Sequence, residues 1–202
     1  QTQGEVTCSR CQREVDETAF REGLCVCPDC GWHGPLTARD WVALLADPGS
    51  FKEIGRKIYP SDPLHFEDSK PYRQRLREAE ARTGMHDAAL VGEAQLDGHP
   101  VVLVSVGFDF MGGTMGSVVG EKVVRTFQTA TRRRIPVISI LASGGARIQE
   151  GMLALMQMAK TAAAVSRHQA ERLLYVSVLT HPSFGGPFAS FASLGDVLIG
   201  EP

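Results

Sequence analysis

The sequence predicts an α/β protein in which strands alternate with helices. Three apolar runs, at residues 101–110, 135–141 and 173–179, each end near a pair of adjacent glycines that precedes a segment with helical character. Loops that follow parallel strands emerge at the carboxyl ends of the strands, where such sheets bind ligands. We therefore expect the three glycine pairs to meet at one surface.

Length and composition narrow the class of protein. The chain of 202 residues is long enough for one sizeable core and a small appendage. Its formal net charge of -2 provides no general basic field for nucleic acid. No apolar run reaches the roughly 18 residues of a membrane helix. No signal peptide is visible, and we interpret the start at Gln1 as trimmed.

The cysteines are confined to the first part of the chain, within residues 8–30. Four of them form two CxxC pairs that are fifteen residues apart: Cys8, Cys11, Cys27 and Cys30. Two such pairs supply the four thiolates of a tetrahedral zinc site, and a site without an open position is structural. We therefore expect a zinc ribbon over residues 1–33 and interpret Cys25 as a spare thiol.

Residues 34–88 are expected to be connecting helices. Thr37 has the side chain of an N-cap for a helix that runs to Leu45. The segment 69–83 is rich in arginine and glutamate, and we interpret it as a solvated amphipathic helix. A rim of cations for a phosphorylated ligand is the alternative.

Residues 89–202 are expected to form the core domain. An Asp97-Gly98 turn between residues 91–96 and 101–106 predicts a hairpin. A helix is expected over residues 117–133, with four inward residues: Val119, Val123, Phe127 and Ala130.

Further helices and strands follow the second apolar run. Apolar residues spaced by three and four predict a helix that opens after Gly144-Gly145 and ends near His168: Ile148, Met152, Leu155, Met156, Ala159 and Ala163. A short helix is expected over 187–194 and a strand over 196–199. A strand at that place leaves a sheet edge and apolar surface that another segment must cover.

The Gly144-Gly145 turn has the layout of an oxyanion hole. Two glycines between a strand and a helix present backbone N–H groups that no side chain obstructs, near the positive end of a helix dipole. The alternative is a tight turn that needs glycine for a positive φ.

Several longer motifs together resemble one family, the zinc-binding β subunit of the carboxyltransferase of bacterial and plastid acetyl-CoA carboxylase. The resemblance covers nearly the whole chain and is carried by residues 8–30, 69–72, 83–84, 110–120, 142–147, 149–150, 155–160 and 189–192. It implies a crotonase-like (ClpP/crotonase) spiral fold. It also implies transfer of a carboxyl group from carboxybiotin to acetyl-CoA, giving malonyl-CoA, the first step of fatty-acid synthesis.

The resemblance implies roles for the glycine turns. Gly144 and Gly145 would be catalytic, holding the thioester oxygen as an enolate through their N–H groups. The substrate-binding residues would be Gly112, Gly113, Met115, Gly116, Ser143, Ala146, Arg147, Gly185 and Gly186. The released biotin would act as the base, so that no catalytic histidine or glutamate is required.

The resemblance also implies partners. These are the carboxyltransferase α subunit in an α2β2 assembly, the biotin carboxyl carrier protein and biotin carboxylase. The location would be the cytoplasm, or the plastid stroma in a plant, and no membrane partner is expected. The chain departs from the family at His181, where an acidic residue is usual, and at Pro187, where a small β-branched residue is usual.

Three other functions were weighed against this one. A carboxyltransferase or decarboxylase for another acyl-CoA would use the same site. A serine hydrolase would need Ser143, His181 and Asp196 to form a triad, which is defined by geometry and not by chain order. The ribbon could instead bind nucleic acid, but its few arginines are interleaved with acidic residues.

Overall fold

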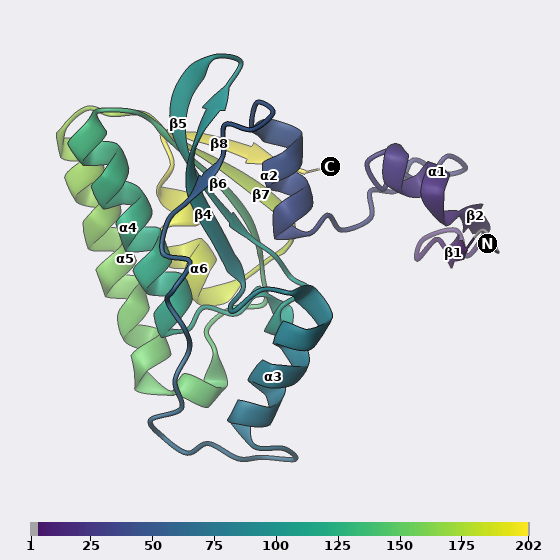
Figure 1. Ribbon diagram of the computed structural model, residues 1–202, viewed down its shortest axis with the longest axis horizontal. Coiled ribbons are helices and arrows are strands. Elements are labelled where there is room, and N and C mark those ends of the chain that lie inside the picture. Colours follow the sequence, from purple (N-terminus) through teal and green to yellow (C-terminus); the bar gives the residue numbers. More distant parts are fainter. Residues whose placement is uncertain (1–3, 202) are drawn as a thin grey trace. The chain divides into compact units, whose positions relative to one another are not determined.

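The computed structural model describes residues 4–201, which form two compact units (Figure 1). The first unit ends at Leu36 and the second spans Thr37–Glu201. The sequence had placed a further boundary at residue 88. The segment that begins at Thr37 instead belongs to the same unit as the sheet.

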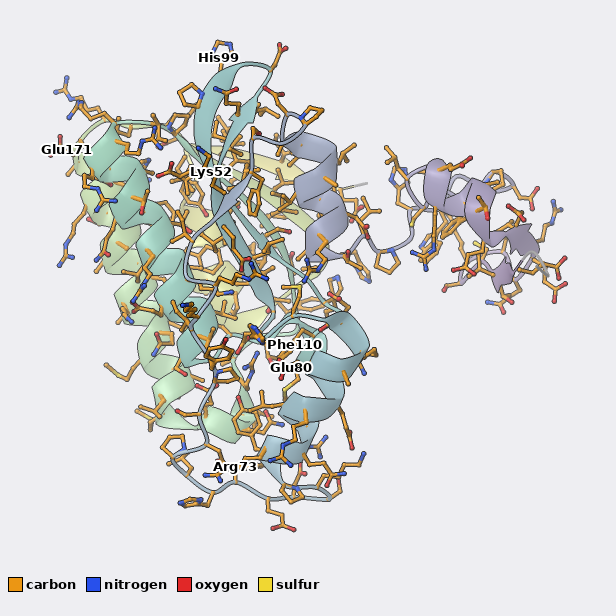
Figure 2. All side chains as sticks on the ribbon, viewed as in Figure 1. Lys52, Arg73, Glu80, His99, Phe110 and Glu171 are labelled. Carbon is orange, nitrogen blue, oxygen red and sulfur yellow. The ribbon has the colours of Figure 1, made fainter. Side chains whose placement is uncertain are left out.

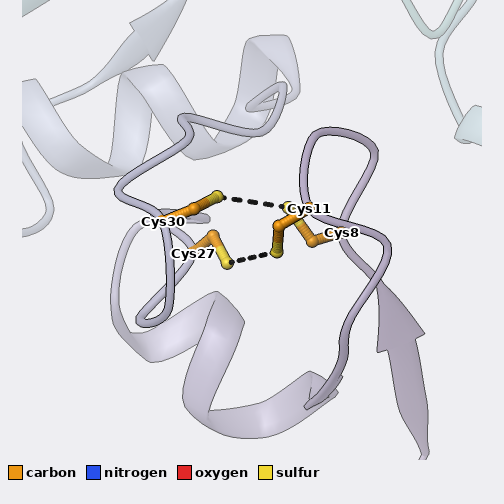
Figure 3. A group of neighbouring side chains, drawn as sticks. All are labelled: Cys8, Cys11, Cys27 and Cys30. Atoms are coloured by element: carbon orange, nitrogen blue, oxygen red, sulfur yellow. Dashed lines mark hydrogen bonds between the residues drawn. The ribbon is translucent and has the colours of Figure 1, made fainter.

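The first unit is a small ribbon of two strands and one short helix. Strand β1 (Glu5–Thr7) pairs antiparallel with β2 (Glu14–Asp16), and α1 (Glu17–Glu22) follows directly. The Asp16 side chain caps α1 by accepting the N–H of Ala19 at 2.8 Å. The cysteine pairs lie on two turns that bring their sulfur atoms together (Figure 3).

The second unit is built on one mixed sheet of six strands. They lie in sequence order: β3 (Lys52–Glu53), β4 (Ala89–Leu96), β5 (His99–Val106), β6 (Val137–Ser143), β7 (Tyr175–Ser183) and β8 (Val197–Gly200). The pairs from β3 to β5 are antiparallel and those from β5 to β8 are parallel. The three strands behind the first argument, β5, β6 and β7, are therefore parallel, as that argument requires. The predicted hairpin between β4 and β5 is confirmed.

Helices and short 3-10 turns surround this sheet. Their bounds are α2 (Ala38–Leu45), α3 (Tyr72–Thr83), α4 (Ser117–Arg133), α5 (Met152–Ala170) and α6 (Gly185–Ser190), with 3-10 turns η1 (Met111–Gly113), η2 (Ile148–Glu150) and η3 (Ala192–Leu194). Helices α4 and α5 pack side by side, and α2 packs against β4 and β5 (Figure 1). Figure 2 shows Phe110 beside α3, where Arg82 donates to the carbonyl of Asp109 at 2.6 Å.

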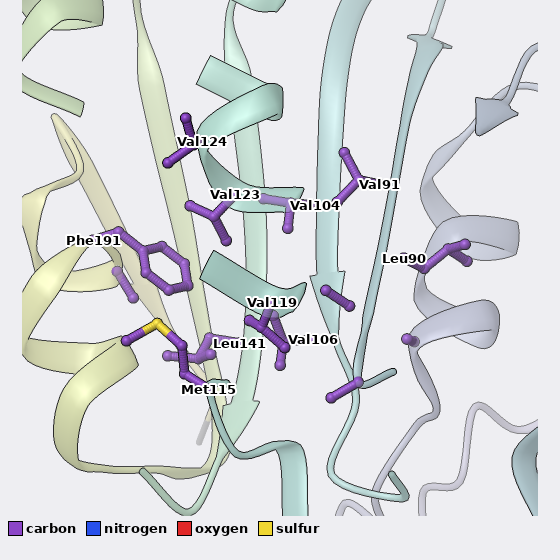
Figure 4. Packing of buried hydrophobic residues seen from close by; sticks show 14 of the residues in the cluster. Leu90, Val91, Val104, Val106, Met115, Val119, Val123, Val124, Leu141 and Phe191 are labelled. Carbon is purple, nitrogen blue, oxygen red and sulfur yellow. The ribbon is translucent and has the colours of Figure 1, made fainter. Parts of the chain in front are cut away.

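Helix α4 provides the main apolar contact with the sheet. All four residues expected on its inner face are fully buried: Val119, Val123, Phe127 and Ala130. Val119 and Val123 meet Val104, Val106 and Leu141 of the central strands (Figure 4). Burial of each such side chain contributes about 1.5–3 kcal/mol, so this contact is the core of the unit.

Helix α5 exposes to solvent the apolar residues whose spacing predicted it. Met152 is 66% exposed and Met156 is 56% exposed. The buried face instead carries small and polar residues: Ala154, Gln157, Thr161, Ala164, Val165 and His168. Close packing on α4 explains this choice, because a Cβ at Gly120 would lie 2.3 Å from Oε1 of Gln157. Periodicity identified the helix but did not show which face packs on the core.

Two further features concern exposed apolar surface. Strand β8 lies at the edge of the sheet, and Val197, Leu198 and Ile199 are each about half exposed, as the sequence predicted. Within residues 4–201, no helix is both long enough and apolar enough to cross a bilayer.

His168 links α5 to α4 as a buried neutral histidine. The carbonyl of Leu174, 3.3 Å from Nε2, can only accept, so Nε2 carries the hydrogen. Nδ1 then accepts from the hydroxyl of Thr131 at 3.0 Å. Burial lowers the pKa of His168 below its usual range, although the Leu174 carbonyl and the Asp196 carboxylate oppose this shift.

The folded state should therefore lose stability as the pH falls below about 6.5, because the unfolded chain then binds a proton that folded His168 resists. His168→Gln can keep both hydrogen bonds without titrating. We expect the free energy of unfolding in urea to fall more between pH 7.5 and 5.5 for the wild type than for this variant. Equal losses would show that His168 does not contribute.

Candidate active site

The three glycine turns meet at the carboxyl end of the parallel strands. The N–H of Gly144 donates to the carbonyl of Gly112 at 2.8 Å. A Cβ at Gly185 would lie only 2.9 Å from Cα of Gly145. The predicted convergence of the three turns is confirmed.

The close approach of these turns explains several of the glycines. A Cβ at Gly113 would lie 2.0 Å from the carbonyl oxygen of Ala142, a contact that no side chain can make. Gly145 has φ +122, a conformation that other residues rarely adopt. The alternative reading of the turn, in which glycine serves the backbone, is therefore correct at Gly145.

The turn after β6 is extended and not helical. A short parallel bridge ties it to the neighbouring loop: Met115 donates to the carbonyl of Gly145 at 2.8 Å, and Arg147 donates to that of Met115 at 2.9 Å. Helix α5 begins only at Met152, after η2. The expected helix dipole at Gly144-Gly145 is therefore absent, and hydrogen bonds alone fix this turn.

The backbone donors of the turn differ from the expected pair. The N–H of Gly144 is already bonded to Gly112, so it is not free for a ligand. The N–H of Gly145 meets only the Ser143 hydroxyl, at 3.1 Å. Within the described part of the chain, the N–H of Ala146 has no acceptor. Of these three N–H groups, only that of Ala146 is both unbonded among the described residues and on a residue that lines the neighbouring cleft, whereas Gly145 is buried.

A cleft of about 400 Å³ opens between α3 and this turn. It is lined by Arg75, Glu78, Ala79 and Arg82 of α3 and by Met111, Thr114, Gly144, Ala146, Ile148 and Gln149. Gly144 is exposed and Ala146 half-buried, so the turn is open to this cleft. The arrangement can admit an elongated ligand whose polar oxygen reaches backbone N–H groups.

Two arginines of α3, Arg75 and Arg82, line the cleft. The sequence predicts a solvated helix for the segment that carries them. Arg75 is held by Asp68 and by the hydroxyl of Ser69 at 3.0 Å, and the Arg75 guanidinium lowers the pKa of Asp68. The Nε of Arg75 is buried without an acceptor. Arg82 is anchored on the carbonyl of Asp109. The sequence of segment 69–83 does not indicate which of its arginines line the cleft.

Arg147 is not available to a substrate, contrary to expectation. Its guanidinium is fully buried and donates two hydrogen bonds to the Asp87 carboxylate, at 2.7 and 2.8 Å. It also donates to the Tyr72 hydroxyl at 3.2 Å, to Oγ1 of Thr114 at 3.2 Å and to the carbonyl of Thr114 at 2.8 Å. All five N–H donors are therefore satisfied. Burial disfavours this charge, but Asp87 outweighs the cost and raises the pKa of Arg147.

Met115, Gly116 and Ser143 are likewise buried and cannot line a substrate pocket directly. Gly116 serves a close contact, because a Cβ there would lie 2.2 Å from Oε1 of Glu150. Gly113 and Gly186 are buried, whereas Gly112 and Gly185 are partly or fully exposed. Six of the predicted binding residues are thus buried and shape the site from within: Gly113, Met115, Gly116, Ser143, Arg147 and Gly186.

A serine-hydrolase triad is not present. His181 is exposed and its backbone N–H donates to Glu201 at 2.9 Å. The Asp196 carboxylate accepts the N–H of Tyr175 at 2.8 Å. Neither side chain bonds Ser143, whose hydroxyl accepts the N–H of Gly145. The other departure, Pro187, stands in the first turn of α6, where its missing N–H has no helical partner to lose.

The four cysteines of the ribbon form a compact donor set. All four sulfur atoms lie within 4.8 Å of one another, with 3.7 Å between Cys8 and Cys30 and 3.8 Å between Cys11 and Cys27 (Figure 3). Tetrahedral bonds of about 2.3 Å to zinc would separate sulfurs by about 3.8 Å. Backbone N–H groups, that of Cys11 first, lower the pKa of Cys8 to about 6, while desolvation raises that of Cys30 to about 12. Cys25 is outside this cluster.

Comparison with known proteins identifies close relatives. Residues 32–199 match the family model described as the carboxyl transferase domain. The chain is 47% identical over 197 residues to the acetyl-coenzyme A carboxylase carboxyl transferase subunit beta of Prochlorococcus marinus strain MIT 9303, covering 98% of this chain and 67% of that protein. It is 49% identical over 195 residues to the same subunit of Synechococcus sp. strain JA-3-3Ab, covering 96% of this chain and 62% of that protein. The chain thus spans about two thirds of the length of these relatives.

Solved structures share the fold. The transcarboxylase 12S hexamer, with hydrolysed methylmalonyl-coenzyme A bound, superposes with a TM-score of 0.68 at 28% identity, covering 83% of this chain and 30% of that one. The MdcD-MdcE heterodimer of Pseudomonas malonate decarboxylase gives a TM-score of 0.62 at 26% identity, covering 82% and 61%.

Proposed function

This chain belongs to the carboxyl transferase family, among the β subunits of acetyl-CoA carboxylase, and we propose that it binds acetyl-CoA and transfers to it the carboxyl group of carboxybiotin. Its fold is the crotonase-like α/β fold of the related carboxyltransferases. The product would be malonyl-CoA, which places the reaction at the start of fatty-acid synthesis.

One observation carries this proposal: the turn after β6 borders a cleft, and the N–H of Ala146 there has no acceptor among residues 4–201. The adjacent N–H of Gly145 would have to exchange its bond to the buried Ser143 hydroxyl for one to the oxyanion. Both are fixed by the bridge between Met115 and the turn. Such preorganised donors stabilise an oxygen that gains charge during reaction, by about 3–4 kcal/mol for each donor.

The reaction requires little more from this chain. Carboxybiotin, carried by a partner, would first give up its carboxyl group as CO2, and the nitrogen so freed would take a proton from the methyl carbon of acetyl-CoA. The negative charge would then lie on the thioester oxygen, where the N–H groups of the turn would meet it. The methyl carbon would finally form its bond to the carbon of CO2, giving the new carboxylate. No nucleophilic side chain is needed.

The arginines that line the cleft suit the phosphate groups of coenzyme A. Coenzyme A carries phosphate groups at the end remote from the thioester. Arg75 and Arg82 line the same cleft as Ala146. We infer that these two residues meet phosphate oxygens when acetyl-CoA is bound.

A side chain at Gly144 should lower the rate of carboxyl transfer and leave the fold intact. A Cβ there would contact only Gly112 and Phe108, at 3.4 and 3.7 Å, but would project at the cleft. We expect Gly144→Val to lower kcat/KM for carboxyl transfer by about 100-fold, comparable with the loss of one oxyanion donor. The assay is carboxyl transfer with the α partner, or malonyl-CoA decarboxylation with biotin.

Two matched variants make this assay decisive. Gly200→Val adds the same side chain on β8, where a Cβ meets nothing within 4 Å, and should leave activity unchanged. Ser143→Ala removes only the acceptor of the Gly145 N–H and should change activity less than about tenfold. An inactive Ser143→Ala enzyme beside an active Gly144→Val enzyme would contradict the proposal and favour a hydrolase.

The exposed face of α5 supports a role in a multi-subunit enzyme, which the name of the family implies. Apolar residues recur along this face at helical spacing, from Ile148 at 78% exposure to Met152 and Met156. Contiguous apolar surface of this kind marks a binding interface. We propose that the carboxyltransferase α subunit covers it in an α2β2 assembly, and that the biotin carboxyl carrier protein and biotin carboxylase complete the enzyme in the cytoplasm or plastid stroma.

Met156→Lys should therefore weaken association with the α subunit by about tenfold or more, because it leaves a charge in a dry interface. Its effect on the free energy of unfolding should stay within about 0.5 kcal/mol, since the residue is exposed. Leu44→Lys on α2, at 45% exposure, is the control and should bind normally. The measurement is titration calorimetry; equal affinities for both variants would locate the interface elsewhere.

The ribbon is proposed to hold structural Zn²⁺ through Cys8, Cys11, Cys27 and Cys30. The donor set fits, since the four sulfurs lie within 4.8 Å of one another and two of their separations, 3.7 and 3.8 Å, match those around a tetrahedral zinc ion. The apolar cluster around them is small, so the metal would provide much of the folding free energy of this unit.

Cys8→Ser should reduce the metal content from one zinc per chain to about none and unfold the ribbon, whereas Cys25→Ala should keep the metal. Zinc is measured by atomic emission after dialysis, and folding of the ribbon by fluorescence of Trp32, which packs on this cluster. Loss of zinc in the Cys25 variant with retention in the Cys8 variant would overturn the ligand assignment.

A further inference from the structure

A network of buried polar side chains lies directly beneath the cleft. Glu150, at the end of η2, accepts the hydroxyl of Tyr72 on Oε1 at 2.8 Å and the N–H of Ser117 on Oε2 at 2.6 Å. Arg147 donates to the same Tyr72 hydroxyl at 3.2 Å. The three side chains are at most 1% exposed. None of them can touch a substrate, so their role must be exerted through the segments that they join.

The Tyr72 hydroxyl joins the two walls of the cleft. Tyr72 is the first residue of α3, the helix that supplies Arg75, Ala79 and Arg82 to one wall. Its hydrogen-bond partners belong to the segment that follows Ala146 and forms the other wall. The hydroxyl uses its one donor and an acceptor lone pair in these two bonds, so its position is determined from both sides.

The charges around this hydroxyl keep it in one orientation. The Glu150 carboxylate lies at the first residue of α4, where the positive end of the helix dipole favours an anion. Arg147 cannot accept, so the Tyr72 hydrogen must point to Glu150. Burial, with Glu150 acting in the same direction, raises the pKa of Tyr72, and the hydroxyl therefore stays protonated.

We propose that Tyr72 is a positioning residue for the acyl-CoA substrate: its hydroxyl, held between Glu150 and Arg147, fixes α3 at the distance from the Gly144–Gln149 wall that the bound substrate requires. The inference rests on the proposed function of the cleft. It also gives a role to one residue in each of two sequence motifs, Tyr72 in 69–72 and Glu150 in 149–150.

The test removes two buried tyrosine hydroxyls one at a time. Both variants are made in the full chain and assayed in complex with the α subunit. Tyr72→Phe removes the link between the walls and keeps the ring. Tyr175→Phe removes a hydroxyl that is equally buried but bonds Ser139 at 2.9 Å and the carbonyl of Phe191 at 3.1 Å, away from the cleft. Both variants should lower the melting temperature. Only Tyr72→Phe should raise KM for acetyl-CoA, by about tenfold, with kcat within about threefold of the wild type.

Hydrogen exchange without substrate gives a readout that does not depend on activity. In Tyr72→Phe, amides of α3 and of residues 147–151 should exchange faster together, while those of β6 and β7 should not change. A double variant with Glu150→Gln should raise KM by less than the product of the two single effects, because both residues act through one contact.

An unchanged KM in Tyr72→Phe, or an equal rise in Tyr175→Phe, would overturn the proposal. Absence of carboxyl transfer by the wild-type complex would instead overturn the proposed function. In that case, faster exchange of both walls in Tyr72→Phe alone would still uphold the link between them, and unaltered exchange would refute it.

Discussion

The buried guanidinium of Arg147 is the interaction on which the geometry of the site depends. It bonds Asp87 just before β4, Tyr72 on α3 and Thr114 in the loop before α4, and it is itself part of the turn after β6. A buried charge is tolerated only when a counter-charge and hydrogen bonds replace the lost water. Since all five donors are bonded, moving any one of these segments would leave a polar group unsatisfied. The site is rigid for this reason.

Glycine makes this convergence sterically possible. Gly113 and Gly116 stand where a Cβ would collide with Ala142 and Glu150, and Gly145 adopts a positive φ. Gly144 differs, because a Cβ there has room and its N–H is already bonded. The glycines required by the backbone and the glycine that borders the cleft are therefore different residues within the same motifs.

Local signals in the sequence were sufficient for several elements and for the meeting of the three turns, but not for the start of α5 at Met152. The Asp97-Gly98 turn, the inner face of α4 and the four-cysteine cluster all have short-range signatures. The orientation of α5 could not be read, because periodicity shows which residues share a face and not what that face meets. The role of Arg147 was also inaccessible, since its ion-pair partner Asp87 lies 60 residues away in the chain.

The segment η2 borders both the cleft and the exposed apolar face of α5. Ile148 lines the cleft and also begins the exposed apolar face that continues along α5. Two residues later, Glu150 is bonded to Tyr72 on α3 and to the start of α4. A subunit seated on the α5 face would therefore contact the wall that the Tyr72 hydroxyl holds in place. The proposed subunit interface and the proposed substrate cleft would therefore share one 3-10 turn of three residues, whose far end is fixed by the bonds of Glu150.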